Sequence, residues 1–157
     1  MATTRHASKA RPGVRPKRGE IYLTALDPTV GREIRKTRPA LVIQNDTSNQ
    51  HDATTLVAPI TSTVRFPMSP VHVLLPADPT TGLAVASVAV FNQIRAVDRA
   101  RLIKKLGEAS AAAMLEVDVA IHTSFGLSCF AMGSGAPETT IAISESTAEL
   151  KTGRYEP

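Results

Sequence analysis

The side chains with the clearest chemical potential lie where predicted strands begin or end. Arg38 stands directly before an apolar run, Thr61 follows another, and Gln93 ends a third. A guanidinium can fork onto two phosphate oxygens while a threonine hydroxyl donates to a third. Each residue alone also has an ordinary interpretation, as a surface charge, a strand-end hydroxyl or a ladder residue. If the strand ends meet on one rim, the set predicts a site for a polyanion.

The segment GREIRKTRP, residues 31–39, is the densest cationic cluster outside the termini, with four Lys/Arg and one Glu. The net charge of +4 is unevenly distributed: residues 1–18 sum to +6, residues 19–127 to zero and residues 128–157 to −2. The basic balance of the whole chain is therefore weak evidence for nucleic-acid binding. Only this local cluster, on an otherwise neutral core, supports contact with phosphates.

Hydrophobic periodicity divides the chain into short strands followed by one helix. Alternating or continuous apolar runs predict strands over 19–25, 40–44, 54–58, 71–75 and 84–91, with 93–97 continuing the last. The polar residues 45–50 read as turn and loop. Asp98 is expected to cap a short helical piece through 106. Ser110 is expected to cap a longer helix that ends at Gly126 and buries Met114, Val117, Ile121 and Phe125.

This order of elements predicts a mainly β (α+β) fold, a small twisted antiparallel barrel of five or more strands with a C-terminal helix. A basic flexible arm (1–18) precedes the folded part (19–127), and a polar, mobile tail (128–157) follows it, with a possible extra strand at 140–143. So few strands leave exposed edges, which favours a homodimer.

Composition excludes several classes of protein. No apolar run approaches the 18 residues of a membrane span, and the basic N-terminus lacks the apolar stretch of a secretory signal. Cys129 is the single cysteine, so an intramolecular disulfide is impossible and a cytoplasmic location is favoured. The four histidines, His6, His51, His72 and His122, share no metal-ligand spacing. We therefore expect no metal and no cofactor, and read the histidines as ordinary surface or strand residues.

RNA is a polyanion that such a site could cleave without a protein nucleophile, because RNA carries its own 2′-OH. The enzyme must align that oxygen with the phosphorus, stabilise negative charge and manage two protons. Arginine, with a pKa above about 12, is a weak base, so charge stabilisation is the role that physics supports for Arg38.

Three segments resemble the MazF/PemK family of toxin endoribonucleases: GREIRKTRPALVIQND (31–46), VAPITST (57–63) and VFNQIRAVDRARLIKKLG (90–107). The resemblance runs from about Arg18 to Leu127, with the segments in the family's order. It implies an SH3-like barrel that forms a homodimer and cuts single-stranded mRNA at a short sequence without metal. The products would carry a 2′,3′-cyclic phosphate and a 5′-OH. It also implies a partner, an antitoxin (MazE-like) whose flexible segment blocks the RNA groove.

Carried over by position, Arg38 and Thr61 are the implied catalytic pair. The residues implied to contact or position RNA, together with weaker candidates from the same rim, are Glu33, Arg35, Lys36, Asn45, Ser62, Arg65, Ser87, Asn92, Gln93 and Arg95. Two departures matter. Arg35-Lys36 stands where many relatives have glycine, which bears on the cleavage sequence, and Asn92 stands where some PemK-like members have an Asp base.

Two other functions remain open from the sequence. A barrel of the same class could bind nucleic acid or a partner without catalysis, with Thr61 and Gln93 in structural roles. A gyrase-binding toxin of similar fold would act through protein contacts and leave RNA whole.

Overall fold

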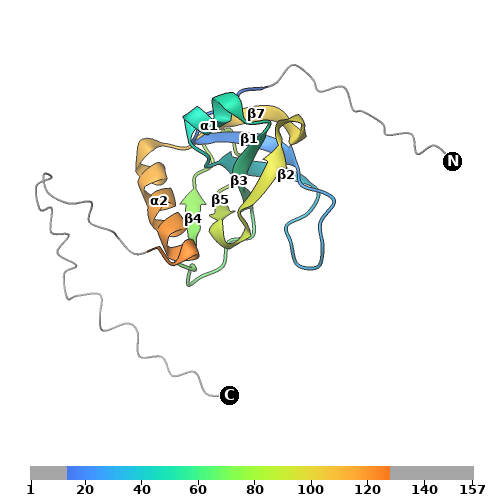
Figure 1. The fold of residues 1–157 in the computed structure, drawn as a ribbon. Helices are drawn as coiled ribbons and strands as arrows, with labels where there is room; N and C mark the ends of the chain where they lie inside the picture. The colour runs from blue at the N-terminus through green and yellow to red at the C-terminus, as the bar shows by residue number, and fades with distance from the viewer. Residues whose placement is uncertain (1–13, 128–157) are drawn as a thin grey trace, which may run out of the picture.

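The computed structural model describes residues 14–127, which form one curved sheet, two α-helices and two 3-10 turns (Figure 1). Our predictions for Cys129, His6 and residues 140–143 lie outside the described residues. In chain order the elements are β1 (Glu20–Ala25), β2 (Thr37–Val42), α1 (Asp46–His51), β3 (Thr54–Thr61), β4 (His72–Leu75), β5 (Ser87–Val90), η1 (Phe91–Gln93), β6 (Arg95–Asp98), η2 (Arg99–Arg101), β7 (Leu102–Glu108) and α2 (Ala111–Phe125).

The sheet is antiparallel throughout and its order is β4-β5-β3-β2-β1-β7, with β6 paired to β3. The prediction of a mainly β fold with a C-terminal helix is confirmed, and the described strands number seven. β3 lies at the centre because it pairs with β2 on one side and with both β6 and β5 on the other.

The two ends of the strand order approach each other, which gives the sheet its barrel-like curl. The loop between β4 and β5 lies against β7: Glu108 N–H donates to the Thr80 carbonyl at 2.8 Å. A Cβ built on Gly82 would stand 2.1 Å from the carbonyl oxygen of Leu106, and one on Gly107 2.1 Å from that of Thr80. Glycine is required where two backbones pass so closely. Within the described residues no strand ladder completes the closure.

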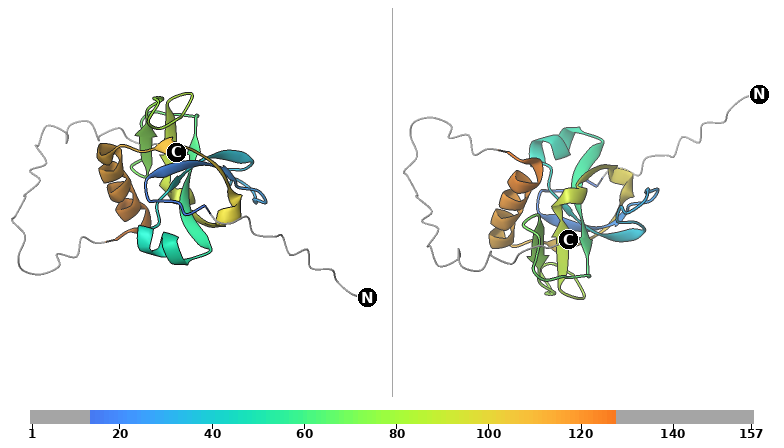
Figure 2. Two further views of the ribbon diagram at one scale, coloured as in Figure 1. Left: turned by 90° about the horizontal axis from the view of Figure 1, so that it is seen from above. Right: turned by 90° about the horizontal axis from the view of Figure 1, so that it is seen from below.

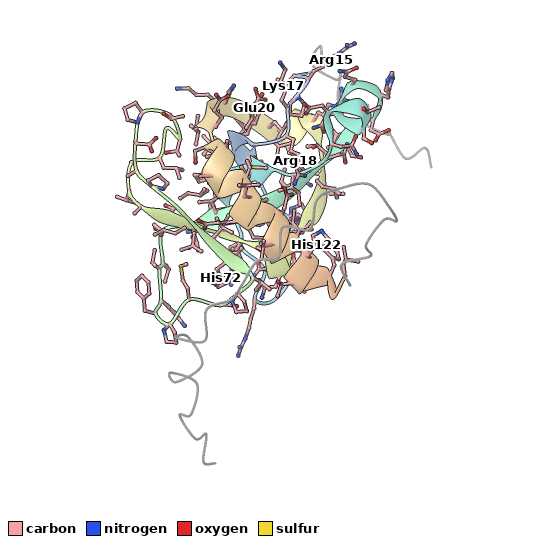
Figure 3. The ribbon with its side chains drawn as sticks, turned by 90° about the vertical axis from the view of Figure 1, so that its left-hand side faces the viewer. Arg15, Lys17, Arg18, Glu20, His72 and His122 are labelled. Carbon is pink, nitrogen blue, oxygen red and sulfur yellow. The ribbon has the colours of Figure 1, made fainter. Side chains whose placement is uncertain are left out.

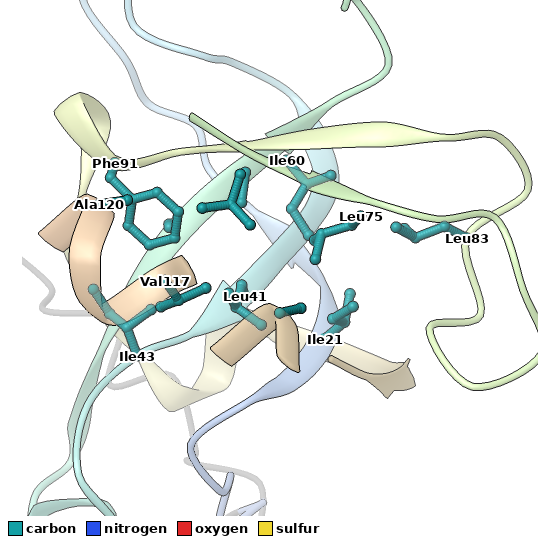
Figure 4. Close-up of a cluster of buried hydrophobic side chains, with 13 residues drawn as sticks. Ile21, Leu41, Ile43, Ile60, Leu75, Leu83, Phe91, Val117 and Ala120 are labelled. Atoms are coloured by element: carbon teal, nitrogen blue, oxygen red, sulfur yellow. The ribbon is translucent and has the colours of Figure 1, made fainter. Parts of the chain in front are cut away.

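Each face of the sheet has its own apolar core. The larger one lies beneath α2 and brings together Ile21, Leu41, Ile60 and Phe91 with Val117 of the helix (Figure 4). The smaller one, on the opposite face, contains Tyr22, Ala40, Val42, Val57, Val97 and Leu102. The alternation of buried faces along β2 and β3 follows from the period of two in a strand.

α2 begins and ends where the sequence predicts. The Ser110 hydroxyl accepts from Ala113 N–H at 3.1 Å, and Gly126 is left-handed with φ 62°. The prediction of the buried face is wrong in part, because Phe125 is 59% exposed and the buried residues are Ala113, Val117 and Ala120. No helix within residues 14–127 is long and apolar enough to cross a membrane.

Two further predictions are wrong. The polar residues 45–50 are not all loop: Asn45 caps the short helix α1, and the buried Asn49 accepts from the Thr55 hydroxyl at 2.8 Å. The predicted helical piece through 106 is limited to η2, after which residues 102–108 form strand β7. The Asp98 cap is present, with its carboxylate accepting from Ala100 N–H at 2.8 Å. Pairing with β1 overrides the helical propensity of the Leu/Lys-rich segment.

Arg18, which we placed in the flexible arm, contacts both helices. Its guanidinium bonds to Asp118 of α2 at 2.6 Å and to the Ile43 carbonyl, and its backbone N–H donates to Asp46 at 2.7 Å. In Figure 3 Arg18 lies between the N-terminal segment and α2. The folded part of the chain therefore includes Arg18.

The close approach at Gly82 predicts a large cost for any side chain there. Gly82→Ala should lower the free energy of unfolding by at least about 2 kcal/mol, because φ is +66° and the new Cβ meets the Leu106 carbonyl. Gly126→Ala is the control: its φ is +62°, but nothing lies within 4 Å of the added Cβ. Urea unfolding of both variants separates the clash from the backbone term, and equal losses would contradict the close approach.

Candidate functional site

Strand register brings Arg38 and Thr61 to facing positions. The β2–β3 ladder pairs Val42 with Val57 and Ala40 with Pro59. The paired residues end at Ala40 and Pro59, and the same register continued by two residues sets Arg38 opposite Thr61. In an antiparallel pair, residues directly opposite share a face. Both side chains therefore belong to the face of the smaller core, away from α2.

The hydrogen bonds of this pair leave donors available. Arg38 Nε donates to the Arg35 carbonyl at 3.1 Å, and within residues 14–127 neither of its terminal nitrogens has a hydrogen bond. The Thr61 hydroxyl oxygen accepts from Thr63 N–H at 3.2 Å, which orients the oxygen and leaves its proton free to donate. The arrangement can present a guanidinium and a hydroxyl to one anion.

An interruption between β5 and β6 positions the amides beside this pair. β3 pairs Ile60 with Ala89 of β5 and Val57 with Arg95 of β6. Four residues of β3 (57–60) thus face seven residues of the partner segment (89–95), and the three extra residues form η1, which contains Asn92 and Gln93. The extra residues leave the ladder, as in a bulge, and re-aim side chains beside the strand end.

A groove follows this end of the sheet and consists of two hollows. The first, about 390 Å³, is lined by Glu33, Ile34, Pro59, Ile94, Arg95 and Ala96, with Asn92 and Gln93. The second, about 640 Å³, is lined by Arg32, Ile34, Thr61, Thr63, Arg65, His72 and Val90, again with Asn92 and Gln93. Because three residues belong to both hollows, we describe them as one groove.

The loop between β1 and β2, residues 26–36 (the β1–β2 loop), carries most of the cationic cluster and forms one wall of the groove. In Figure 1 it extends on the side of the sheet away from α2, and Figure 2 shows the same separation from two other directions. Its base is fixed by Asp27, whose carboxylate accepts from Lys36 N–H at 3.0 Å. Arg101 donates to the Ala25 carbonyl at 3.1 Å and also to that of Asp27.

The middle of the β1–β2 loop is joined to the far wall of the groove by two contacts. Ile34 N–H donates to Gln93 Oε1 at 2.7 Å, and Arg95 Nη1 lies 3.7 Å from Glu33 Oε2. Glu33 also accepts from Val30 N–H at 3.2 Å within the loop. The structure thus brings two residues outside the loop that are implied to contact or position RNA, Gln93 and Arg95, into contact with the loop.

The other residues named from the sequence lie in different places. Arg65 lines the groove, Ser62 is exposed just beyond β3, and Arg35 and Lys36 are exposed on the β1–β2 loop. Ser87 is buried at the start of β5 and donates to the Val85 carbonyl. Asn45 lies at the other end of β2 from Arg38, where it caps α1 by accepting from Ser48 N–H at 2.8 Å.

His72 is the groove residue that the sequence reasoning missed. It lines the larger hollow, and it also borders a hollow of about 330 Å³ between β4 and α2; Figure 3 shows it below the helix. The available signal was the position of His72 on its strand, facing away from the apolar Val71 and Val73. Within residues 14–127 no cluster of His, Cys, Asp or Glu could hold a metal ion.

The strongest pKa shifts belong to a cluster on β1 and β7, outside the groove. Burial would raise the pKa of Glu20, but hydrogen bonds from Lys105 Nζ at 2.7 Å, Lys17 N–H and the Tyr22 hydroxyl lower it overall. Burial, and then the Glu20 carboxylate, raises the pKa of Tyr22 to about 12. The pKa of Lys105 is raised by its hydrogen bond with Glu20. These shifts reflect an ion pair that joins two strands.

A small curved antiparallel sheet, with a helix on one face and a groove with cationic residues on the other, defines the class of fold as a barrel-like antiparallel sheet with a C-terminal helix. The comparison with protein families identifies it further: residues 17–125 match the model described as "PemK-like, MazF-like toxin of type II toxin-antitoxin system". The chain belongs to that family.

Known relatives agree with this assignment. The chain is 40% identical over 114 residues to "Endoribonuclease MazF" of Staphylococcus epidermidis, covering 73% of this chain and 94% of the relative. A crystal structure of MazF from Deinococcus radiodurans matches with TM-score 0.61 and 29% identity over 71% of this chain and 97% of that one. An endoribonuclease "in complex with its cognate antitoxin" from Mycobacterial species matches with TM-score 0.59 and 25% identity, over 72% and 97%.

The buried phenol predicts a late titration. In a Tyr155→Phe variant, which leaves Tyr22 as the single tyrosine, ultraviolet absorbance should show ionisation near pH 12 rather than 10. Because the folded pKa is raised, the stabilisation linked to Tyr22 is complete below pH 10 and is lost as pH rises toward 12. Glu20→Gln should lower the Tyr22 pKa, and an unchanged titration would contradict the contact.

Proposed function

We propose that Arg38 and Thr61 form the reaction centre of this toxin, and that the groove beside them binds single-stranded RNA. The chain is a MazF-type endoribonuclease toxin, since the matched family and the relative with 40% identity carry that description. The observation that supports the residue assignment is the register of β2 and β3: continued two residues beyond the pair Ala40–Pro59, it sets Arg38 opposite Thr61 on the face away from α2.

The proposed reaction is an internal transesterification at phosphorus. The ribose 2′-oxygen loses its proton and bonds to phosphorus, and the bond from phosphorus to the 5′-oxygen breaks. The 5′-oxygen takes up a proton, which leaves a 2′,3′-cyclic phosphate and a 5′-OH. The Arg38 guanidinium and the Thr61 hydroxyl stabilise the charge that develops on the non-bridging oxygens. No step draws on a metal ion.

RNA would run along the groove with its phosphates on the cationic side. Arg32 and Arg65 line the larger hollow together with Thr61, whereas Asn92 lies where the two hollows meet. Arg35 and Lys36 are exposed on the β1–β2 loop and attract phosphates from solution. Groups that can donate and accept hydrogen bonds at the base edges, such as Asn92, give the groove its sequence preference.

The same reasoning extends to partners and location. The partner is an antitoxin, as the complex of the Mycobacterial relative with its cognate antitoxin supports. We expect the antitoxin to occupy the groove and exclude RNA. The working unit is a homodimer, as is the rule for the MazF family. Cleavage of mRNA places the toxin in the cytoplasm, where it inhibits translation and growth.

The decisive experiment incubates the protein with a labelled unstructured RNA of mixed sequence in EDTA, beside an all-deoxy strand of the same sequence. Discrete fragments that end in a cyclic phosphate, with the deoxy strand intact, establish the proposed reaction. RNA that shifts in a gel but stays whole would favour a binding module. Whole RNA together with inhibited supercoiling would favour a gyrase-binding toxin.

Arg38→Ala and Thr61→Val should each lower the cleavage rate by about 100- to 1,000-fold, because each removes a donor to the developing charge. Both side chains are partly exposed, so urea unfolding should show little loss of stability. The rate is measured with the labelled RNA under single-turnover conditions. Near-normal cleavage by Arg38→Ala would remove that residue from the reaction centre.

Lys36→Ala should weaken RNA binding and lower the slope of log K against log salt by about 0.7, the value for one phosphate of a single strand. Binding is measured with the all-deoxy strand, which resists cleavage, at several salt concentrations. Lys104→Ala is the matched control, since it removes an exposed lysine from β7. Equal salt slopes for the two variants would contradict a phosphate contact at Lys36.

A further inference from the structure

We infer that Gln93 is a positioning residue that holds the β1–β2 loop in place, and that it does so through its carbonyl oxygen. Ile34 N–H of the loop donates to Gln93 Oε1 at 2.7 Å. This inference rests on the proposed function and changes the role of Gln93 within it. Resemblance to the family implies that Gln93 contacts or positions RNA, whereas here the acceptor atom of its amide accepts a hydrogen bond from the protein's own loop.

The β1–β2 loop depends on this contact for its position across the groove. Its base is fixed by Asp27, but its tip is open to solvent: Val30 is 80% exposed and Arg32 is exposed. Between these parts, Ile34 is partly buried and lines both hollows. The bond to Gln93 therefore fixes the loop at Ile34, the loop residue that lines both hollows.

Of the two contacts that reach the loop, the hydrogen bond of Gln93 is stronger than the ion pair of Arg95. The Arg95–Glu33 pair is 3.7 Å apart, with side chains 28% and 51% exposed. Such a pair is screened by solvent and contributes little. The bond between Ile34 N–H and Gln93 is short and partly buried, so it competes better with water. Arg95 supports the position of Glu33, and Gln93 sets that of Ile34.

A loop that is held before RNA arrives lowers the entropic cost of binding. Without the bond the loop samples many conformations, and RNA must order it when it binds. Arg38 and Thr61 stand on strands, and the loop carbonyl that Arg38 Nε contacts, that of Arg35, lies next to the base of the loop that Asp27 fixes. Their geometry therefore depends little on Gln93. Loss of the bond should therefore raise KM and leave kcat nearly unchanged.

The first test needs no RNA. The exposed Arg32, Arg35 and Lys36 are trypsin sites within the loop, and cleavage there reports how often the loop opens. Gln93→Met removes the acceptor and should speed cleavage at these sites about fivefold, the factor that corresponds to a hydrogen bond of about 1 kcal/mol. Gln93→Glu keeps an acceptor oxygen, so its cleavage should stay within about twofold of wild type.

Loop fragments are followed by mass spectrometry, which separates them from cuts near the termini. Exchange of the Ile34 amide hydrogen gives a second measurement: it should be slow in wild type and in Gln93→Glu, and faster in Gln93→Met. Unchanged trypsin cleavage and unchanged exchange in Gln93→Met would overturn the inference. So would a Gln93→Glu protein that behaves as Gln93→Met.

The second test measures cleavage of RNA. Gln93→Met should raise KM about fivefold with kcat within about twofold of wild type, since the same bond is lost. Gln50→Met, which changes an exposed glutamine of α1, is the matched control and should match wild type. A lower KM would mean that the bond blocks the groove, and a lower kcat at unchanged KM would place Gln93 at the reacting phosphate. Either result overturns the inference.

The two tests separate this inference from the proposed function. If wild-type protein leaves RNA intact, the proposed function fails, yet trypsin cleavage and amide exchange still decide whether Gln93 holds the loop. If RNA is cleaved but the loop of Gln93→Met is as protected as that of wild type, the proposed function stands and the role of Gln93 is wrong.

Discussion

The site depends on one constraint, the pairing of β3 with three neighbours. β2 accompanies β3 along one edge, and β6 and then β5 accompany it along the other. Because β3 pairs with two different strands along this second edge, the ladder is interrupted between them, and η1 lies at the interruption. The register with β2, continued two residues past Ala40 and Pro59, sets Arg38 opposite Thr61, and the interruption brings Asn92 and Gln93 to the hollow that Thr61 lines. Hydrogen bonding of the backbone thus locates side chains that lie far apart in the sequence.

The two faces of the sheet consequently have different roles, one in packing and the other in the candidate site. α2 covers one face and supplies Val117 and Ala120 to the larger core. The approach of the β4–β5 loop to β7 adds Leu83 and Leu106 to the same core, whereas Thr61 lines the groove. The shifted pKa values of Glu20, Tyr22 and Lys105 lie on the strands that close the sheet. The groove residues are instead held by neutral hydrogen bonds and by a weak ion pair.

Much of this arrangement could be predicted from the sequence because its signals are local. Alternation defined β1, the Ser110 and Gly126 caps bounded α2, and the Arg-Pro and Pro-Ile-Thr motifs pointed to one rim. The failures came from tertiary contacts. The sequence of β7 favours a helix, and its pairing with β1 makes it a strand. The sequence of α1 is typical of a loop, and the burial of Asn49 against Thr55 stabilises it as a helix. The bond between Ile34 and Gln93 joins residues far apart in sequence, and a list of polar residues contains no sign of it.

At position 36 the stability of the fold and the positive charge of the β1–β2 loop favour different residues. Lys36 has φ 71°, in the left-handed region that favours glycine, and its backbone closes the base of the β1–β2 loop through Asp27 and Leu26. A lysine there costs about 1–2 kcal/mol relative to glycine. A glycine at this point would make the fold more stable and the loop less cationic in a single step. Selection for higher stability alone would therefore favour glycine at position 36 and weaken the binding of polyanions by the loop.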